Sequence, residues 1–251
     1  MLLIKHLLVA IQNWITVQIT IFGFYSKSSQ DELVRLGSDY GGWWLPKAAI
    51  SSNHSLKVAI SAGLGFDVSF DKALLQSGFE VIGLDPLDEC IDHANSSLQG
   101  FDGFSSLRKG LWKTTGVQNF FPPKISTHDS WSVINIQNSS VSGIKSFEVI
   151  SLEDLFGLYP KLKESDYRIL KMDIEGSELE VMKSLPTFNY KFDFIGIEID
   201  FLSLIPFLQI RNRVKMIGIA RSLLKDFNSI GYRLVKTENF NFFWIQTSHN
   251  I

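Results

Sequence analysis

Apolar residues form short runs in the middle of the chain, and each run is followed by a turn signal. A run over residues 58–60 leads into a glycine turn, after which apolar residues recur at helical spacing as far as Gly78. A second run over residues 81–84 ends in Asp85-Pro86. This order of strand, turn, helix and strand predicts a parallel sheet covered by helices.

The stretch that follows is less regular. Residues 107–112, 117–121 and 131–136 have the composition of β segments and are separated by Pro122-Pro123 and a polar loop. We expect a third parallel strand here, followed by a β insertion. Regularity returns at residues 147–150, a further strand, after which Ser151 and Asp154 form a predicted capping box at a helix start.

The second half of the chain continues the alternation of strands and helices. We expect, in order, a strand ending in Asp173, a helix from Gly176-Ser177, a strand over 194–199, a helix over 209–230, and strands over 232–236 and 241–246. The last two strands are separated by a short turn and predict an antiparallel hairpin. A plain dinucleotide-binding sheet is wholly parallel, so the hairpin sets this sheet apart.

Residues 1–55 are treated as a helical segment that leads into a main domain over residues 56–251. Residues 1–24 are mostly apolar, but polar residues from Lys5 to Gln18 interrupt them too often for a typical membrane span. We favour an N-terminal helix packed on the domain. A helix on a membrane surface comes next, and a secretory signal comes last.

Composition narrows the classes of function. The 251 residues carry a formal charge of −2, so nucleic acid is not expected as a partner. The single cysteine, Cys90, can form no internal disulfide. This fits a reducing compartment, and we expect a cytoplasmic protein of unknown oligomeric state.

The candidate chemistry begins at the glycine turn Gly63-Leu64-Gly65. A glycine turn between a strand and a helix lets the backbone approach a ligand closely, next to unpaired amides at the helix start. Asp85 follows about 20 residues later at the end of the next strand, where a carboxylate accepts the hydroxyls of a ribose. Together the turn and the acid predict a nucleoside-containing cofactor without distinguishing one cofactor from another.

A second candidate lies in the segment Lys171-Met172-Asp173-Ile174-Glu175-Gly176. Asp173 ends a strand that this topology places beside the first one, so its side chain would face the crevice where open α/β sheets bind ligands. The alternative is a structural role, in which Asp173 caps the helix that follows.

Three stretches resemble the FkbM family of methyltransferases over roughly residues 56–236. They are residues 61–71 with 81–86, residues 150–155, and residues 170–181 with the Asp-Ile-Glu-Gly block. The resemblance implies a Rossmann-like class I methyltransferase. That fold is a mostly parallel seven-stranded sheet with a C-terminal antiparallel hairpin and helices on both faces. It also implies S-adenosyl-L-methionine (SAM) as the methyl donor and, most often, a hydroxyl as the acceptor.

The resemblance also implies roles for individual residues. Gly63 and Gly65 would face the amino-acid part of SAM, Asp85 would hold its ribose, and Asp173 would lie near the methyl-transfer centre. The cofactor set is completed by Ser61, Asp67 and Pro86. Class I enzymes usually have an acid where Ser61 stands and a glycine where Asp67 stands, a departure that a subgroup of the family shares.

A hydroxyl acceptor must lose a proton, so a base or a metal is required. The candidate bases are Asp173, Glu175 and His128. His128 could equally be a surface histidine, and Glu175 could cap its helix. Glu198 could join Asp173 in an acidic pocket or pair with a neighbour. No histidine or cysteine cluster has the spacing of a metal site.

The leading hypothesis is therefore SAM-dependent O-methylation of a sugar-like or secondary-metabolite acceptor, which is a small molecule or a glycan. One alternative is an NAD-linked Rossmann oxidoreductase that uses the same turn, although the Asp-Ile-Glu-Gly block and the hairpin count against it. The other is a Rossmann-like binding protein without turnover.

Overall fold

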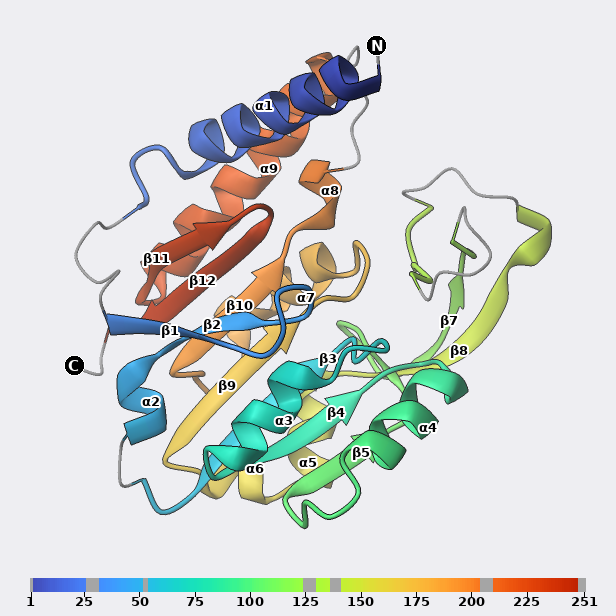
Figure 1. The fold of residues 1–251 in the computed structure, drawn as a ribbon, viewed down its shortest axis with the longest axis vertical. Helices are drawn as coiled ribbons and strands as arrows, with labels where there is room; N and C mark the ends of the chain where they lie inside the picture. The colour runs from blue at the N-terminus through green and yellow to red at the C-terminus, as the bar shows by residue number, and fades with distance from the viewer. Residues whose placement is uncertain are drawn as a thin grey trace.

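The computed structural model describes residues 2–25, 32–51, 54–123, 130–135, 141–203 and 210–247 (Figure 1). The helices are α1 (Leu2–Ile21), α2 (Lys47–Ser51), α3 (Ser69–Gln76), α4 (Asp88–Ser97), α5 (Leu152–Leu158), α6 (Lys161–Glu164), α7 (Glu178–Ser184), α8 (Asp200–Ser203) and α9 (Ile210–Ser229). The strands are β1 (Leu33–Leu36), β2 (Trp43–Pro46), β3 (Lys57–Ala62), β4 (Phe79–Leu84), β5 (Phe104–Leu107), β6 (Gly110–Leu111), β7 (Gly116–Phe120), β8 (Lys145–Ile150), β9 (Tyr167–Met172), β10 (Phe194–Glu198), β11 (Tyr232–Glu238) and β12 (Asn241–Gln246).

The main sheet has seven strands within the described residues, in the order β11-β12-β10-β9-β3-β4-β5. The pairings β10–β9, β9–β3, β3–β4 and β4–β5 are parallel, whereas β12 runs antiparallel to both β10 and β11. The expected fold class is confirmed, including the closing hairpin and the position of β9 beside β3.

Residues alternate between the two faces of the sheet, as the geometry of a strand requires. Along β3, Val58 and Ile60 belong to one core, which is closed by α1, α5, α7 and α9, while Ala59 belongs to the other, closed by α3, α4 and the β1–β2 pair. Helices therefore cover both faces. The α3 face also carries Lys171, because Ile169 lies in that core and the side chains of β9 alternate.

The segment expected to be helical, residues 1–55, contains helices α1 and α2 but also a pair of antiparallel strands, β1 and β2. The prediction was wrong on this point, because residues 43–46 form strand β2, whose Trp43 and Leu45 are buried. Helix α1 packs along α9 (Figure 1), as favoured from the sequence. Among the described helices none is long and apolar enough to cross a membrane.

The middle of the chain departs from the expected β segments. The segment 107–112, expected as one β segment, is divided between two sheets. Leu107 is the last residue of β5, the edge strand of the main sheet, whereas β6 pairs with β8 in a separate sheet of order β6-β8-β7. Within residues 130–135, only Ser132 makes a β contact, an isolated bridge to Phe121. The apolar side chains of this stretch were taken for a strand, but Trp131 packs on Phe147 instead.

Candidate active site

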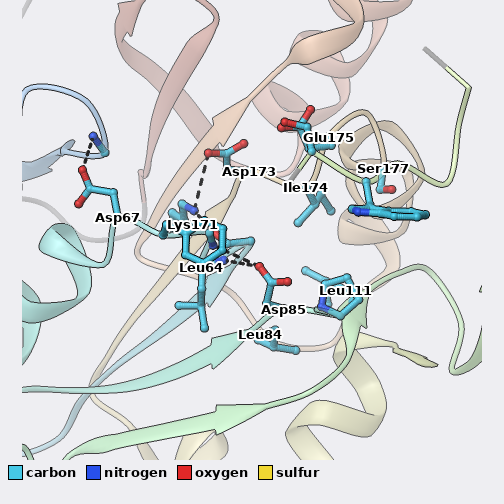
Figure 2. Close-up of a pocket in the computed structure, with 18 of the residues that line it drawn as sticks. Leu64, Asp67, Leu84, Asp85, Leu111, Lys171, Asp173, Ile174, Glu175 and Ser177 are labelled. Carbon is cyan, nitrogen blue, oxygen red and sulfur yellow. Dashed lines mark hydrogen bonds and ion pairs between the residues drawn. The ribbon is translucent and has the colours of Figure 1, made fainter. Parts of the chain in front are cut away.

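A cleft opens at the carboxyl ends of β3, β4 and β9. Its empty space, open solvent at the mouth included, is about 920 Å³. The glycine turn after β3, Asp85 after β4 and Asp173 after β9 line the cleft, together with Tyr40, Gly41, Trp43 and residues of β6 and β7. Figure 2 shows these side chains converging from separate strands.

The glycine turn is fixed by its own backbone. Gly63 and Gly65 both have positive φ angles, of 77° and 55°, which glycine adopts without steric cost. A Cβ on Gly63 would overlap the carbonyl oxygen of Asp173, because the turn passes directly against the end of β9. Gly63 is therefore required for the contact between the two strand ends, which brings Asp173 to the cleft.

Asp85 is buried beneath the turn and holds it. One carboxylate oxygen accepts the amides of Leu64 and Gly65 at 3.1 and 3.2 Å, and the other accepts the amide of Leu87 at 2.9 Å. Burial raises the pKa of Asp85 to about 6, against the effect of these three amides. A carboxylate has about four acceptor positions, so Asp85 keeps capacity for a ligand hydroxyl.

Asp67, which stands in place of the usual third glycine, ties the turn to the loop before β2. Its carboxylate accepts the Ser38 hydroxyl at 2.5 Å and the Gly41 amide at 3.2 Å, and its other oxygen accepts the Ser69 amide at 3.0 Å. Desolvation is the largest single effect on the pKa of Asp67 and raises it. The hydrogen bonds together outweigh desolvation and hold this pKa below its ordinary value. The side chain thus positions the wall of the cleft that contains Tyr40 and Gly41.

Lys171 is a buried cation at the floor of the cleft. Its ammonium donates to the carbonyl oxygens of Gly63 and Ala62, lies 5.3 Å from the ring centre of Trp43, and is 3.9 Å from a carboxylate oxygen of Asp173 (Figure 2). Carbonyls and an aromatic face are suitable partners for a desolvated ammonium. Lys171 therefore connects the glycine turn, the β2 wall and Asp173.

Ser61 lies below the cleft and outside its lining. Its side chain is fully buried on the α3 face of β3, next to Asp71 of α3, and it lowers the pKa of that carboxyl. Burial is the larger effect and raises the pKa of Asp71, while Lys171 opposes it. Ser61 is thus placed to support the turn from underneath. Pro86, by contrast, lines the cleft beside Asp85.

The turn after β9 carries backbone strain. Glu175 has a φ angle of 56°, which is uncommon for a residue with a side chain, and Gly176 follows with 91°. The carboxylate that satisfies this turn belongs to Glu178, whose oxygen accepts the amides of Ile174 and Gly176 at 2.9 and 3.1 Å. Helix α7 accordingly begins at Glu178, two residues later than expected.

Acidic side chains gather around Asp173. Burial, together with the nearby charge of Asp173, raises the pKa values of Glu198 and Glu178 to about 8 each. Burial and the same charges also raise the pKa of Asp200. Glu198 is close enough to Asp173 and Glu175 to feel their charges, and of these three residues Asp173 and Glu175 line the cleft. Among the described residues, no group of histidine, cysteine and acidic side chains is arranged to hold a metal ion.

The remaining predicted residue, His128, lies outside the described residues. Lys171 and Glu178 were not identified as site residues from the sequence. Lys171 is the lysine of the Lys-Met-Asp-Ile-Glu-Gly segment, and its position two residues before Asp173 places both side chains on one face of β9. That spacing was the available signal.

Comparison with known proteins gives one family match. Residues 63–234 match the methyltransferase FkbM domain. No curated protein matches the chain. Among solved structures, the 16S rRNA (adenine(1408)-N(1))-methyltransferase from Catenulisporales acidiphilia is similar at 10% identity, with 87% of this chain and all of that chain covered, at a TM-score of 0.33.

The family match spans more than half of the chain. It contains the glycine turn, Asp85, Lys171 and Asp173, which are the residues that build the cleft. It does not fit the alternative of an NAD-linked oxidoreductase. The chain belongs to the FkbM methyltransferase family.

Proposed function

We propose that the cleft binds SAM and that the protein transfers its methyl group to a hydroxyl oxygen of a sugar-like or secondary-metabolite acceptor. The observation that carries the proposal is the convergence of the glycine turn, Asp85 and Asp173 on one cleft at the carboxyl ends of β3, β4 and β9. SAM is the general methyl donor of methyltransferase families such as this one.

The residues of the cleft fit a nucleoside cofactor. A buried carboxylate at the end of β4 suits ribose hydroxyls, and its pKa of about 6 leaves it ionised at neutral pH. The exposed Phe66 and the buried Leu111 both line the cleft and supply apolar surface for a base. Gly65 and Asp67 lie where the amino-acid end would bind. We assign Ser61 to support of the turn instead of direct contact.

When bound, SAM supplies a methyl group on a positively charged sulfur, so the protein mainly has to align donor and acceptor. Asp173 lines the cleft, and one of its carboxylate oxygens is 3.9 Å from the Lys171 ammonium. We assign Asp173 as the group that accepts the hydroxyl proton. Glu175 is the second candidate, because it lines the same side of the cleft.

The walls of the cleft supply aromatic surface for a cyclic acceptor. Tyr40, Trp43, Phe120 and Trp131 all line it, and they come from the β2 region and from the β6–β8 sheet and its neighbouring loop. Aromatic surfaces with a few polar groups are typical of pockets that bind small organic molecules. A sugar ring or a polyketide-like ring presents both an apolar face and hydroxyl groups to such walls.

The test is a methyl-transfer assay with purified protein, SAM and a panel of acceptors that carry hydroxyl, amine or thiol groups on matched rings. We expect S-adenosylhomocysteine to form with hydroxyl acceptors and the product to carry an O-methyl ether by mass spectrometry. The Asp173→Asn variant should bind SAM but lose at least tenfold in turnover, as usual for loss of a proton acceptor, which contributes about 10²–10⁴.

Methylation of the amine or thiol acceptors alone would contradict the hydroxyl assignment. Binding of SAM without turnover on any acceptor would favour a binding protein that has kept the fold. Wild-type turnover by the Asp173→Asn variant would transfer the assignment to Glu175.

A further inference from the structure

Helix α1 buries Val17, Ile21 and two threonines against the protein, and most of its other large apolar side chains face solvent. Thr16 and Thr20 are buried, and each hydroxyl donates to the carbonyl oxygen four residues earlier, at 2.8 and 2.7 Å. The exposed large apolar side chains of the helix and its end are Leu7, Leu8, Val9, Ile11, Trp14, Ile15, Ile19 and Phe22. Most of these recur at three- and four-residue spacing and form one stripe opposite the threonines, interrupted by the exposed Gln18.

Contacts with α9 fix this orientation. Arg213 donates to the Thr16 hydroxyl at 2.8 Å, and Arg221 donates to the carbonyl oxygens of Ile19 and Phe22 at 2.8 and 2.9 Å. Arg221 thereby satisfies carbonyls that the end of a helix leaves unpaired. Rolling α1 to bury the stripe would break all of these bonds, so the stripe is a fixed feature of the surface. Figure 1 shows α1 along the outer side of α9, at the edge of the molecule.

The charges of the two helices indicate what covers the stripe. Helices α1 and α9 together contain six lysines and arginines and one acidic residue, Asp226, whereas the whole chain has 24 basic and 26 acidic side chains. Arg211 and Lys215 are exposed on the part of α9 that lies along α1, next to Val214, which is 64% exposed.

We propose that the stripe of α1 and the basic side chains of α9 form a docking surface for an anionic lipid bilayer, on which α1 lies parallel to the membrane plane. A helix with large apolar side chains on one side and basic groups at its flank binds at the headgroup boundary. Trp14 and Phe22, 63% and 79% exposed, are the anchors of this surface. A second copy of the chain fits less well, because a two-fold contact through α1 would bring the basic flanks of both copies together.

The experiment is sedimentation of the full chain with vesicles of phosphatidylcholine alone or mixed with phosphatidylglycerol, at low and high salt. We expect binding to the mixed vesicles, with weaker binding as salt rises, because salt screens the attraction between basic side chains and anionic headgroups. The double variant W14Q/F22Q should bind at least tenfold more weakly. The double variant R211Q/K215Q should lose the preference for phosphatidylglycerol.

Val117→Gln is the matched control, since Val117 is also 62% exposed but lies on β7, and its binding should equal that of the wild type. Melting temperature and elution volume of each variant verify that it is folded. No binding of the wild type to mixed vesicles would overturn the proposal. So would equal binding by W14Q/F22Q, or a dimer in gel filtration that W14Q/F22Q converts to monomers.

Discussion

Gly63 is the position where the fold depends most directly on a missing side chain. Its φ angle is positive and a Cβ would overlap the backbone of Asp173, so Gly63→Ala adds a steric overlap to the cost of the left-handed conformation. That conformation alone costs about 1–2 kcal/mol for a residue with a Cβ. We expect Gly63→Ala to lower the free energy of unfolding by more than this amount.

Gly100→Ala separates the two effects. Gly100 also has a positive φ angle, of 103°, but an added Cβ would meet no atom within 4 Å. Chemical denaturation of both variants should therefore show a smaller loss for Gly100→Ala. Equal losses would mean that the contact between the turn and β9 has no energetic consequence.

Asp85 is the residue on which the nucleoside assignment depends. The Asp85→Asn side chain keeps the size of the carboxylate, but its amide nitrogen cannot accept the bonds from the turn. We expect at least tenfold weaker binding of S-adenosylhomocysteine by calorimetry. Asp88→Asn, three residues later and exposed, is the control that should bind as the wild type does. Wild-type affinity of Asp85→Asn would refute the ribose assignment.

Glu198 makes stability depend on pH. Burial raises its folded pKa to about 8 from an ordinary 4.5, so between these pH values the folded state keeps a proton that the unfolded state releases. Stability contributed by this group is therefore present at low pH and declines as pH rises toward 8. Glu198→Gln removes the titration, and its stability relative to wild type should increase between pH 5 and pH 8 by on the order of 1–3 kcal/mol. A difference that stays constant across this range would contradict the pKa assignment.

At the scale of elements, Lys171 of β9 connects the glycine turn after β3 with Asp173 at the end of β9. Replacing it with methionine keeps the length of the side chain but removes the bonds to the carbonyls of the glycine turn. We expect Lys171→Met to weaken SAM binding at least tenfold as well as lowering the melting temperature.

Lys57 on the neighbouring strand β3 offers a matched control. It is also a buried lysine, and its ammonium donates to the carbonyl oxygens of Ala49 and Ser77 at 3.3 and 2.8 Å, away from the cleft. Lys57→Met should lower the melting temperature without changing SAM affinity. Equal effects of both substitutions on affinity would show that Lys171 acts only through general stability.

The strands of the main sheet and the helices that cover it were predictable, because the spacing of apolar residues that marks each element lies within that element. The runs that became β3 and β4 end in turn residues, and Ser151 caps α5 as expected, accepting the Asp154 amide at 3.1 Å. In a capping box the acid would accept the Ser151 amide. Here the Asp154 carboxylate accepts the hydroxyls of Ser151 and Thr115, and the Ser151 amide donates to the Thr115 hydroxyl instead. Thr115 is remote in sequence, so only the fold brings it there.

The cleft could be predicted only in part for the same reason. Gly63, Gly65, Asp85 and Asp173 are identified by local motifs at strand ends. Trp43 reaches the site because β2 packs across the sheet, with its ring against Gly196 and Phe243. Contacts of this kind depend on long-range packing, and the spacing of apolar residues within 25–56 does not predict it.

At the scale of the whole molecule, the order of the strands makes the site. Strands β3 and β9 are about 110 residues apart in the chain yet pair directly, with Ser61 opposite Lys171 and Ala62 opposite Met172. Their carboxyl ends consequently meet at one edge, which is where open α/β sheets bind ligands. The parallel centre supplies the cleft, and the antiparallel hairpin of β11 and β12 extends the sheet beyond β10.

The most direct test of a SAM site in this cleft is titration calorimetry of the full chain with SAM, S-adenosylhomocysteine and NAD. We predict that SAM and S-adenosylhomocysteine each bind with one-to-one stoichiometry and that NAD gives no measurable heat of binding. Binding of NAD without binding of SAM or S-adenosylhomocysteine would contradict the account.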